Sequence, residues 1–105
     1  MSVIESKDWS AIEGTDLTGG NRTLTVSGEV EMSAANEVPV LAEAMPQGIN
    51  PRILILELTV HTEGDVGADV LTWTTATFSK PISLREYEEV EIRDQATVKV
   101  EEVLS

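Results

Sequence analysis

The segment RILILELTVHT, from Arg52 to Thr62, decides the fold class of this chain. Its apolar side chains recur at every second position, which is the period of a strand that buries one face. Ile53 and Ile55 are apolar on the opposite parity, and this predicts a central strand whose early half is covered on both sides. The predicted inward row is Leu54, Leu56, Leu58 and Val60.

The segment from Arg22 to Met32 shows the same alternation at its even positions. Gly28 interrupts the inward row, and a glycine inside a strand indicates a bulge or the close approach of another backbone or a large side chain. The side chains predicted to face the core from this strand are Leu24, Val26, Val30 and Met32.

The segment from Glu37 to Ala44 predicts a strand at the edge of a sheet. Pro39 lacks the amide hydrogen that a central strand donates to its neighbour. Met45 to Pro51 follows with two prolines and a glycine, a composition typical of a loop. Alternation in the edge strand places four side chains inward, namely Val38, Val40, Ala42 and Ala44.

The segment from Val70 to Ser79 breaks simple alternation, because its large apolar residues lie on two parities. A β-bulge near Thr74 and Thr75 would turn all of them to the core, and we predict that bulge. Without it, one aromatic side chain would be exposed and available to a ligand or a partner. The four residues concerned are Leu71, Trp73, Ala76 and Phe78.

The last two strands are predicted to form a hairpin with the loop Asp94-Gln95-Ala96. This register opposes apolar to apolar side chains inside and opposite charges outside. The loop offers no glycine for a left-handed position. The predicted pairs are Arg93 with Thr97, Ile92 with Val98, Glu91 with Lys99, and Val90 with Val100.

The composition agrees with an all-β chain, since Val, Ile and Thr make up 30 of the 105 residues. Short strands separated by turn residues predict an antiparallel β-sandwich of about six to eight strands, with an immunoglobulin-like outline only as an analogy of architecture. Residues 1–21 are rich in turn residues, and we expect a loosely ordered N-terminal arm that Trp9 fastens to the body. Residues 22–105 are predicted to form one β-sandwich domain.

Charge and the missing cysteines exclude several functions. The chain has 7 Lys and Arg against 19 Asp and Glu, a formal net charge of −12, and no cysteine. Disulfides and Cys-bound metals are therefore excluded, and neither nucleic acid nor a membrane surface is expected as a partner. The first residues lack the pattern of a secretory signal, so we expect a cytoplasmic protein, although a signal removed earlier would leave the same sequence.

Catalytic residues are not evident in the sequence, and we predict neither an enzyme nor a cofactor. His61 is the single histidine, and its parity places it on the exposed face of its strand. Glu88 and Glu89 are neighbours in a strand and point to opposite faces, so they do not form a carboxylate pair. A calcium site is an alternative, because carboxylates suit Ca²⁺, and its candidate ligands are Glu63, Asp65 and Asp69.

The leading hypothesis is a non-catalytic acidic protein that acts by binding another protein or by self-association. An alternative is an acidic inhibitor or nucleic-acid mimic that occupies a basic groove on its partner, which requires the carboxylates to gather on one face. The candidate interaction surface consists of residues expected to point outward, namely Tyr87, Glu89, Glu91, Glu29 and Glu31.

Overall fold

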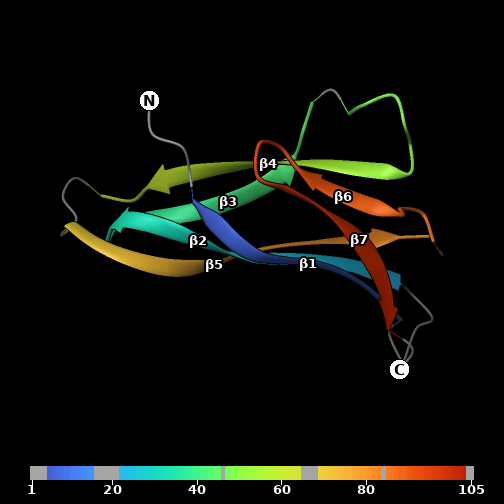
Figure 1. The fold of residues 1–105 in the computed structure, drawn as a ribbon, viewed down its shortest axis with the longest axis horizontal. Helices are drawn as coiled ribbons and strands as arrows, with labels where there is room; N and C mark the ends of the chain where they lie inside the picture. The colour runs from blue at the N-terminus through green and yellow to red at the C-terminus, as the bar shows by residue number, and fades with distance from the viewer. Residues whose placement is uncertain (1–4, 16–21, 46, 65–68, 84, 104–105) are drawn as a thin grey trace.

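The computed structural model describes residues 5–15, 22–45, 47–64, 69–83 and 85–103. These residues form strands and no helix, so the prediction of an all-β chain is confirmed (Figure 1). No helix among them is long and apolar enough to cross a membrane. The strands are β1 (Ser6–Thr15), β2 (Arg22–Ala34), β3 (Glu37–Glu43), β4 (Ile53–Thr62), β5 (Asp69–Ile82), β6 (Glu89–Ile92) and β7 (Ala96–Val103).

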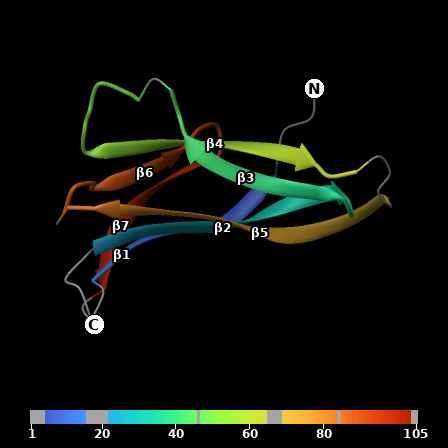
Figure 2. The ribbon, with the colours of Figure 1, turned by 180° about the vertical axis from the view of Figure 1, so that it is seen from behind.

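The seven strands belong to one mixed sheet in the order β3-β4-β6-β7-β1-β2-β5. The pairs β1–β7 and β4–β6 are parallel, and the other neighbours are antiparallel. The sheet curls until its two edge strands, β3 and β5, approach each other, which gives a nearly closed barrel (Figure 2). The expected antiparallel sandwich is therefore not confirmed, since the two layers are joined into one sheet that contains parallel pairs.

Strand β7 joins the two halves of the sheet. Its first residues, from Ala96 to Lys99, pair with β6. From Val100 onward it leaves β6 and pairs in parallel with β1, beginning opposite Ala11. Each half of β7 therefore forms backbone hydrogen bonds with a different neighbour. The core lies between the two halves of the sheet, which β7 connects.

The hairpin register predicted from the sequence is wrong by two residues. Ile92 lies opposite Ala96, and the loop is formed by residues 93–95. Asp94 occupies the left-handed region with φ of 63°, which aspartate tolerates better than most side chains. This loop therefore needs no glycine. The two-residue shift leaves every side chain on its predicted face and opposes Glu89 to Lys99.

The core confirms the predicted faces of β2 and the early part of β4. The inward side chains of β2 and the first two leucines of the β4 row are buried, whereas Leu58 and Val60 are half-buried. In β2 the large apolar side chains have one parity, so only one face could be buried efficiently. In β4, Ile53 and Ile55 have the opposite parity and are half-buried. The buried side chains of the two strands are Leu24, Val26, Val30, Met32, Leu54 and Leu56.

Strand β3 lies at a sheet edge as predicted, but its predicted faces are wrong. Pro39 and Leu41 are buried, whereas Val38 and Val40 are 36% and 40% exposed. Ala42 is also exposed, and only Ala44, just beyond the strand, is buried as predicted. Burying Leu41 removes more apolar area from water than burying Ala42, and the edge position leaves Pro39 with no ladder bond to donate.

The bulge predicted in β5 is absent. Pairing with β2 is continuous from Ile82 to Thr72, and the register shifts only beyond that point. Ala76 is therefore buried and Phe78 packs against the core, as predicted. Leu71 and Trp73 lie on the outer face instead, 74% and 42% exposed. An intact antiparallel ladder keeps its regular series of backbone hydrogen bonds, which a bulge would have interrupted.

Strand β1 comes from the stretch that was expected to be a loosely ordered arm. Residues 6–15 lie between β7 and β2 in the sheet, and residues 1–4 and 16–21 are outside the described part of the chain. Trp9 packs over Gly28, where an added Cβ would overlap the indole ring. The predicted approach of a large side chain to this glycine is confirmed.

Trp9 is held in place by a short chain of hydrogen bonds. Its indole Nε1 donates to Ser6 Oγ at 2.8 Å, and Ser6 Oγ donates to Gln95 Oε1 at 2.5 Å. Gln95 lies in the loop between β6 and β7, so the indole that covers β2 is also linked to the hairpin tip.

We expect Gly28→Ala to lower the free energy of unfolding by about 1–3 kcal/mol, because the added methyl overlaps the Trp9 ring. Gly14→Ala is the matched control, since a Cβ at position 14 of β1 meets no heavy atom within 4 Å. Urea denaturation monitored by circular dichroism measures the free energy of unfolding of both variants. Equal losses for the two variants would contradict the packing of Trp9 on β2.

A second prediction compares the same substitution on two faces. Leu56→Ala should cost about 2–5 kcal/mol, as expected when a buried leucine leaves a cavity. Leu71→Ala should change the stability by less than about 0.5 kcal/mol, because Leu71 is on the outer face. If chemical denaturation ranks the two variants in the opposite order, the inner and outer faces are misassigned.

Candidate functional site

The exposed aromatic side chain of β5 is the centre of the first candidate site, which we call the Trp73 face. It consists of Leu71, Trp73 and Thr75 of β5 with Glu29 and Glu31 of β2. Trp73 lies opposite Glu31 and Thr75 opposite Glu29. Thr75 Oγ1 donates a hydrogen bond to Glu29 Oε1 at 3.2 Å. The face therefore combines an exposed aromatic and an exposed aliphatic side chain with two carboxylates.

Lys7 reaches the Trp73 face from β1. It lies opposite Glu29 in the ladder, and its Nζ is 4.4 Å from the centroid of the Trp73 ring. A cation–π contact at an exposed site contributes about 0.5–1 kcal/mol. This contact is weak enough for a partner's cation to compete for the same ring.

The ion pairs of the chain leave the carboxylates of the Trp73 face unneutralised. Five of the seven Lys and Arg side chains pair with glutamates among the described residues. Neither Glu29 nor Glu31 takes part in these pairs. The five pairs are Arg22–Glu13, Arg52–Glu88, Lys80–Glu43, Arg85–Glu102 and Arg93–Glu57.

The carboxylates of the candidate interaction surface lie on two separate strands. Glu29 and Glu31 are on β2, whereas Glu89 and Glu91 are on β6. Strands β7 and β1 lie between these two in the sheet. The structure therefore gives the nucleic-acid-mimic hypothesis no single strand pair on which these carboxylates gather.

Tyr87, which was expected to point outward, is half-buried and packs against the core. Its hydroxyl accepts a hydrogen bond from Lys80 Nζ at 2.9 Å, and Lys80 also forms an ion pair with Glu43 at 2.8 Å. The hydrogen bond to Glu43, and then the one to Tyr87, raises the pKa of Lys80 above its ordinary range. Lys80 thus links the two edge strands of the sheet, β5 and β3.

The raised pKa of Lys80 gives a pH-dependent prediction. The ammonium stabilises the fold fully below its unfolded pKa of about 10.4, and this contribution is lost as the pH rises through the higher pKa of the folded state. Glu43→Gln should cost less than about 1 kcal/mol at neutral pH, because the ion pair is partly exposed. Denaturation curves should then show a smaller loss of stability above about pH 10 in the variant than in the wild type. An unchanged alkaline loss would contradict the role of this pair.

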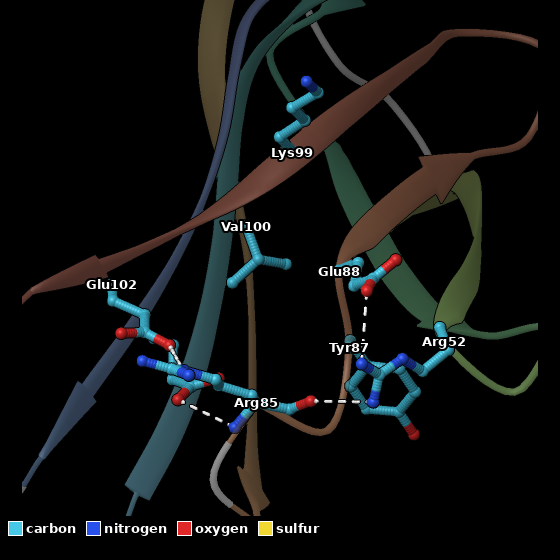
Figure 3. Close-up of a pocket in the computed structure, with 8 residues that line it drawn as sticks. Arg52, Arg85, Tyr87, Glu88, Lys99, Val100 and Glu102 are labelled. Atoms are coloured by element: carbon cyan, nitrogen blue, oxygen red, sulfur yellow. Dashed lines mark hydrogen bonds and ion pairs between the residues drawn. The ribbon is translucent and has the colours of Figure 1, made fainter.

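The second candidate site is a pocket of about 220 Å³ beside the point where β7 leaves β6 to join β1 (Figure 3). At one end of it Arg52 faces the backbone carbonyl of Arg85, whose side chain runs toward Glu102, and Lys99 points away at the other end. Val100 points between β7 and the segment that precedes β6. The pocket is lined by Glu13, Arg52, Arg85, Tyr87, Glu88, Lys99, Val100 and Glu102.

Glu13 is the only charged side chain that is buried among the described residues. Its Oε2 accepts from Arg22 Nε at 2.6 Å, forms an ion pair with Arg22 Nη2 at 2.5 Å, and accepts from the Arg85 backbone N–H at 3.1 Å. Its Oε1 has no hydrogen-bond partner among the described residues. Sequence reasoning missed Glu13 because it lay in the predicted arm, although it shares the inward parity of Trp9 and Ala11.

Arg85 and Arg52 are positioned by hydrogen bonds to backbone and rim groups. Arg85 has φ of 52°, and its Nε donates to Glu102 at 2.7 Å. Arg52 donates to Glu88 at 3.2 Å and to the Arg85 carbonyl at 3.5 Å. These contacts form the dashed network at the arginine end of the pocket in Figure 3.

The calcium candidates are only partly described by the structure. Glu63 is exposed, Asp65 lies outside the described residues, and nothing is described of the Asp69 side chain. Among the residues with described positions, no three His, Cys, Asp or Glu side chains are arranged to hold a metal ion. His61 is exposed, as predicted.

Comparison with known proteins finds no matching family, no similar curated protein and no similar solved structure. The function is therefore inferred from the two candidate sites themselves.

Proposed function

We propose that this protein is a non-catalytic binding module that docks a basic segment of another protein on the Trp73 face. The exposure of Trp73 carries this proposal, since the continuous β5 ladder holds the indole on the outer surface. Tryptophan dominates the energy of many protein interfaces, because it buries a large apolar area with little loss of side-chain entropy. Leu71, two residues before Trp73 in the chain, is exposed as well and adds apolar area that a partner would cover.

The carboxylates beside Trp73 favour a basic partner. Glu31 lies directly opposite Trp73, and Glu29 lies two pairs further along, opposite Thr75. An arginine of a partner would stack on the indole and pair with one of these carboxylates, which Lys7 leaves without an ion pair. The net charge of −12 adds long-range attraction for such a segment and speeds its association at low salt.

The same charge disfavours a second copy of the chain as the occupant. Two molecules of net charge −12 repel each other. A symmetric contact through the Trp73 face would also bring the Glu29 and Glu31 carboxylates of both copies together. We therefore assign the face to a different, basic protein rather than to self-association.

Site-specific photo-crosslinking tests this proposal in cells. A photoreactive amino acid replaces Leu71, and a second variant carries it at Ile49, which is also exposed and lies between β3 and β4. A protein captured at Leu71 but not at Ile49 is then purified, and its binding is measured by calorimetry at several salt concentrations. Trp73→Ala should weaken binding at least about tenfold. Ile49→Ala should leave it unchanged.

Three results would overturn the proposal. Capture of the chain itself, with a dimer in sedimentation experiments that Trp73→Ala dissociates, would replace the basic partner by self-association. Binding that is insensitive to salt would remove the role of the carboxylates. A captured partner that binds Trp73→Ala as tightly as the wild type would remove the role of the indole.

A further inference from the structure

Lys7 lies on the Trp73 face, where the proposed partner would place a cation of its own. Its Nζ is 4.4 Å from the centroid of the Trp73 ring. Lys7 belongs to β1 and Trp73 to β5, and β2 lies between these two strands in the sheet. Neighbouring strands are about 4.8 Å apart, so the lysine side chain crosses the outer face of β2 to reach the ring. The chain therefore covers part of this face with its own ammonium group.

A bulge in β1 turns Lys7 to the outer face. Ser10 pairs with Ser27 of β2. Lys7 pairs with Glu29, so β1 has one residue more than β2 over this stretch. A continuous ladder would place Asp8 opposite Glu29 and turn Lys7 toward the core, because successive side chains of a strand alternate between its faces. The bulge therefore re-aims the lysine and puts a cation, rather than a carboxylate, opposite Glu29.

The backbone on both sides of Lys7 is held in place, whereas its side chain is exposed. Asp8 has φ of 56°, a left-handed conformation that aspartate tolerates better than most residues. On the other side, the Glu5 carbonyl accepts from the Glu31 N–H at 2.9 Å, so β1 stays bonded to β2 beyond the bulge. Lys7 itself is exposed. Its ammonium can therefore leave the ring by rotation of the side chain alone, with no backbone hydrogen bond broken.

The contact between Lys7 and Trp73 is strong enough to reduce a partner's affinity and weak enough to be displaced. An exposed cation–π contact favours the covered ring over the open ring by about two- to fivefold. A ligand that needs the open ring then binds about three- to sixfold more weakly than it would without Lys7, because only the open fraction is competent.

We propose that Lys7 is an internal competitor for the Trp73 face, held over the indole in the free protein and displaced by an arginine of the partner. This inference rests on the proposed function, since it concerns the same site. A lysine of the partner would only exchange one ammonium for another. A guanidinium also stacks in the plane of the indole and forms paired hydrogen bonds with Glu29 or Glu31, so arginine exceeds the threshold that Lys7 sets.

NMR on the full chain tests the displacement, with the acetylated and amidated peptide Gly-Arg-Gly-Arg-Gly as the probe. The Trp73 ring should shift the Lys7 Hε protons upfield in the free protein, and Trp73→Ala should abolish this shift. The peptide should move the Trp73 indole N–H resonance with a dissociation constant on the order of millimolar. At saturation the Lys7 Hε signals should return to their position in Trp73→Ala. The corresponding lysine peptide should bind at least about threefold more weakly, and the neutral citrulline peptide should cause neither change.

Three variants measure the competition at about 150 mM salt, where long-range charge effects are screened. Lys7→Gln should bind the arginine peptide about three- to sixfold more tightly than the wild type. Lys7→Arg keeps a cation on the ring and should bind it no more tightly. Lys99→Gln is the matched control, because it removes the same charge from an exposed position on β7, and it should change the dissociation constant less than about 1.5-fold.

The outcomes separate this inference from the proposed function. If the Trp73 indole responds to the peptide while the Lys7 Hε signals stay upfield, the competition is overturned and the docking site stands. Equal gains in Lys7→Gln and Lys99→Gln would likewise reduce the effect of Lys7 to general charge. Equal binding of the lysine and arginine peptides would overturn the selection of arginine. A Trp73 indole that ignores the arginine peptide even in Lys7→Gln would overturn the proposed function itself.

Discussion

The division of β7 between two partners is the constraint on which the rest of this structure depends. Its first half pairs with β6 and its second half with β1, so the β3-β4-β6 half and the β1-β2-β5 half are one sheet rather than two. A strand that changes partners must separate from its first neighbour. The pocket lies beside this separation, since Lys99 and Val100 both line it. The order of the strands thus accounts for the position of both the core and the pocket.

Side-chain parity predicted the faces wherever one parity carried nearly all of the large apolar residues. Strand β2 satisfies this condition. In the first half of β4 both parities are apolar, and the structure buries Leu54 and Leu56 and leaves Ile53 and Ile55 half-buried. Strand β3 does not satisfy the condition, because Val38 and Val40 compete with Pro39 and Leu41. In the last hairpin, parity cannot distinguish registers that differ by two residues, since both place the same side chains inside. The loop conformation of Asp94 decides between them.

The candidate sites were less predictable, because they depend on pairing between distant segments. In the sequence, Gly28 indicated that a large group packs closely against it in space. Nothing in the residues around Gly28 identified that group as the Trp9 side chain. Trp73 was assigned to the core on the assumption that every large apolar side chain of β5 is buried, and the continuous ladder with β2 overrules this assumption. Glu13 can be recognised as a candidate site residue only from its contacts in the folded chain, where Arg22 and the Arg85 backbone N–H donate to it.

The placement of the few cations makes the two candidate sites chemically opposite. Most Lys and Arg side chains are engaged by glutamates of other strands or segments, which leaves the outer face of β2 acidic around Trp73. Two of these cations, Arg52 and Arg85, line the pocket beside their partners Glu88 and Glu102, and the buried carboxylate of Glu13 is neutralised there by Arg22. An anion is therefore repelled less at this end of the molecule than at the Trp73 face. A cation is attracted more strongly to the Trp73 face than to the pocket. The same scarcity of positive charge that leaves the Trp73 face acidic thus places three of the seven cations at the pocket, where they lie beside three carboxylates.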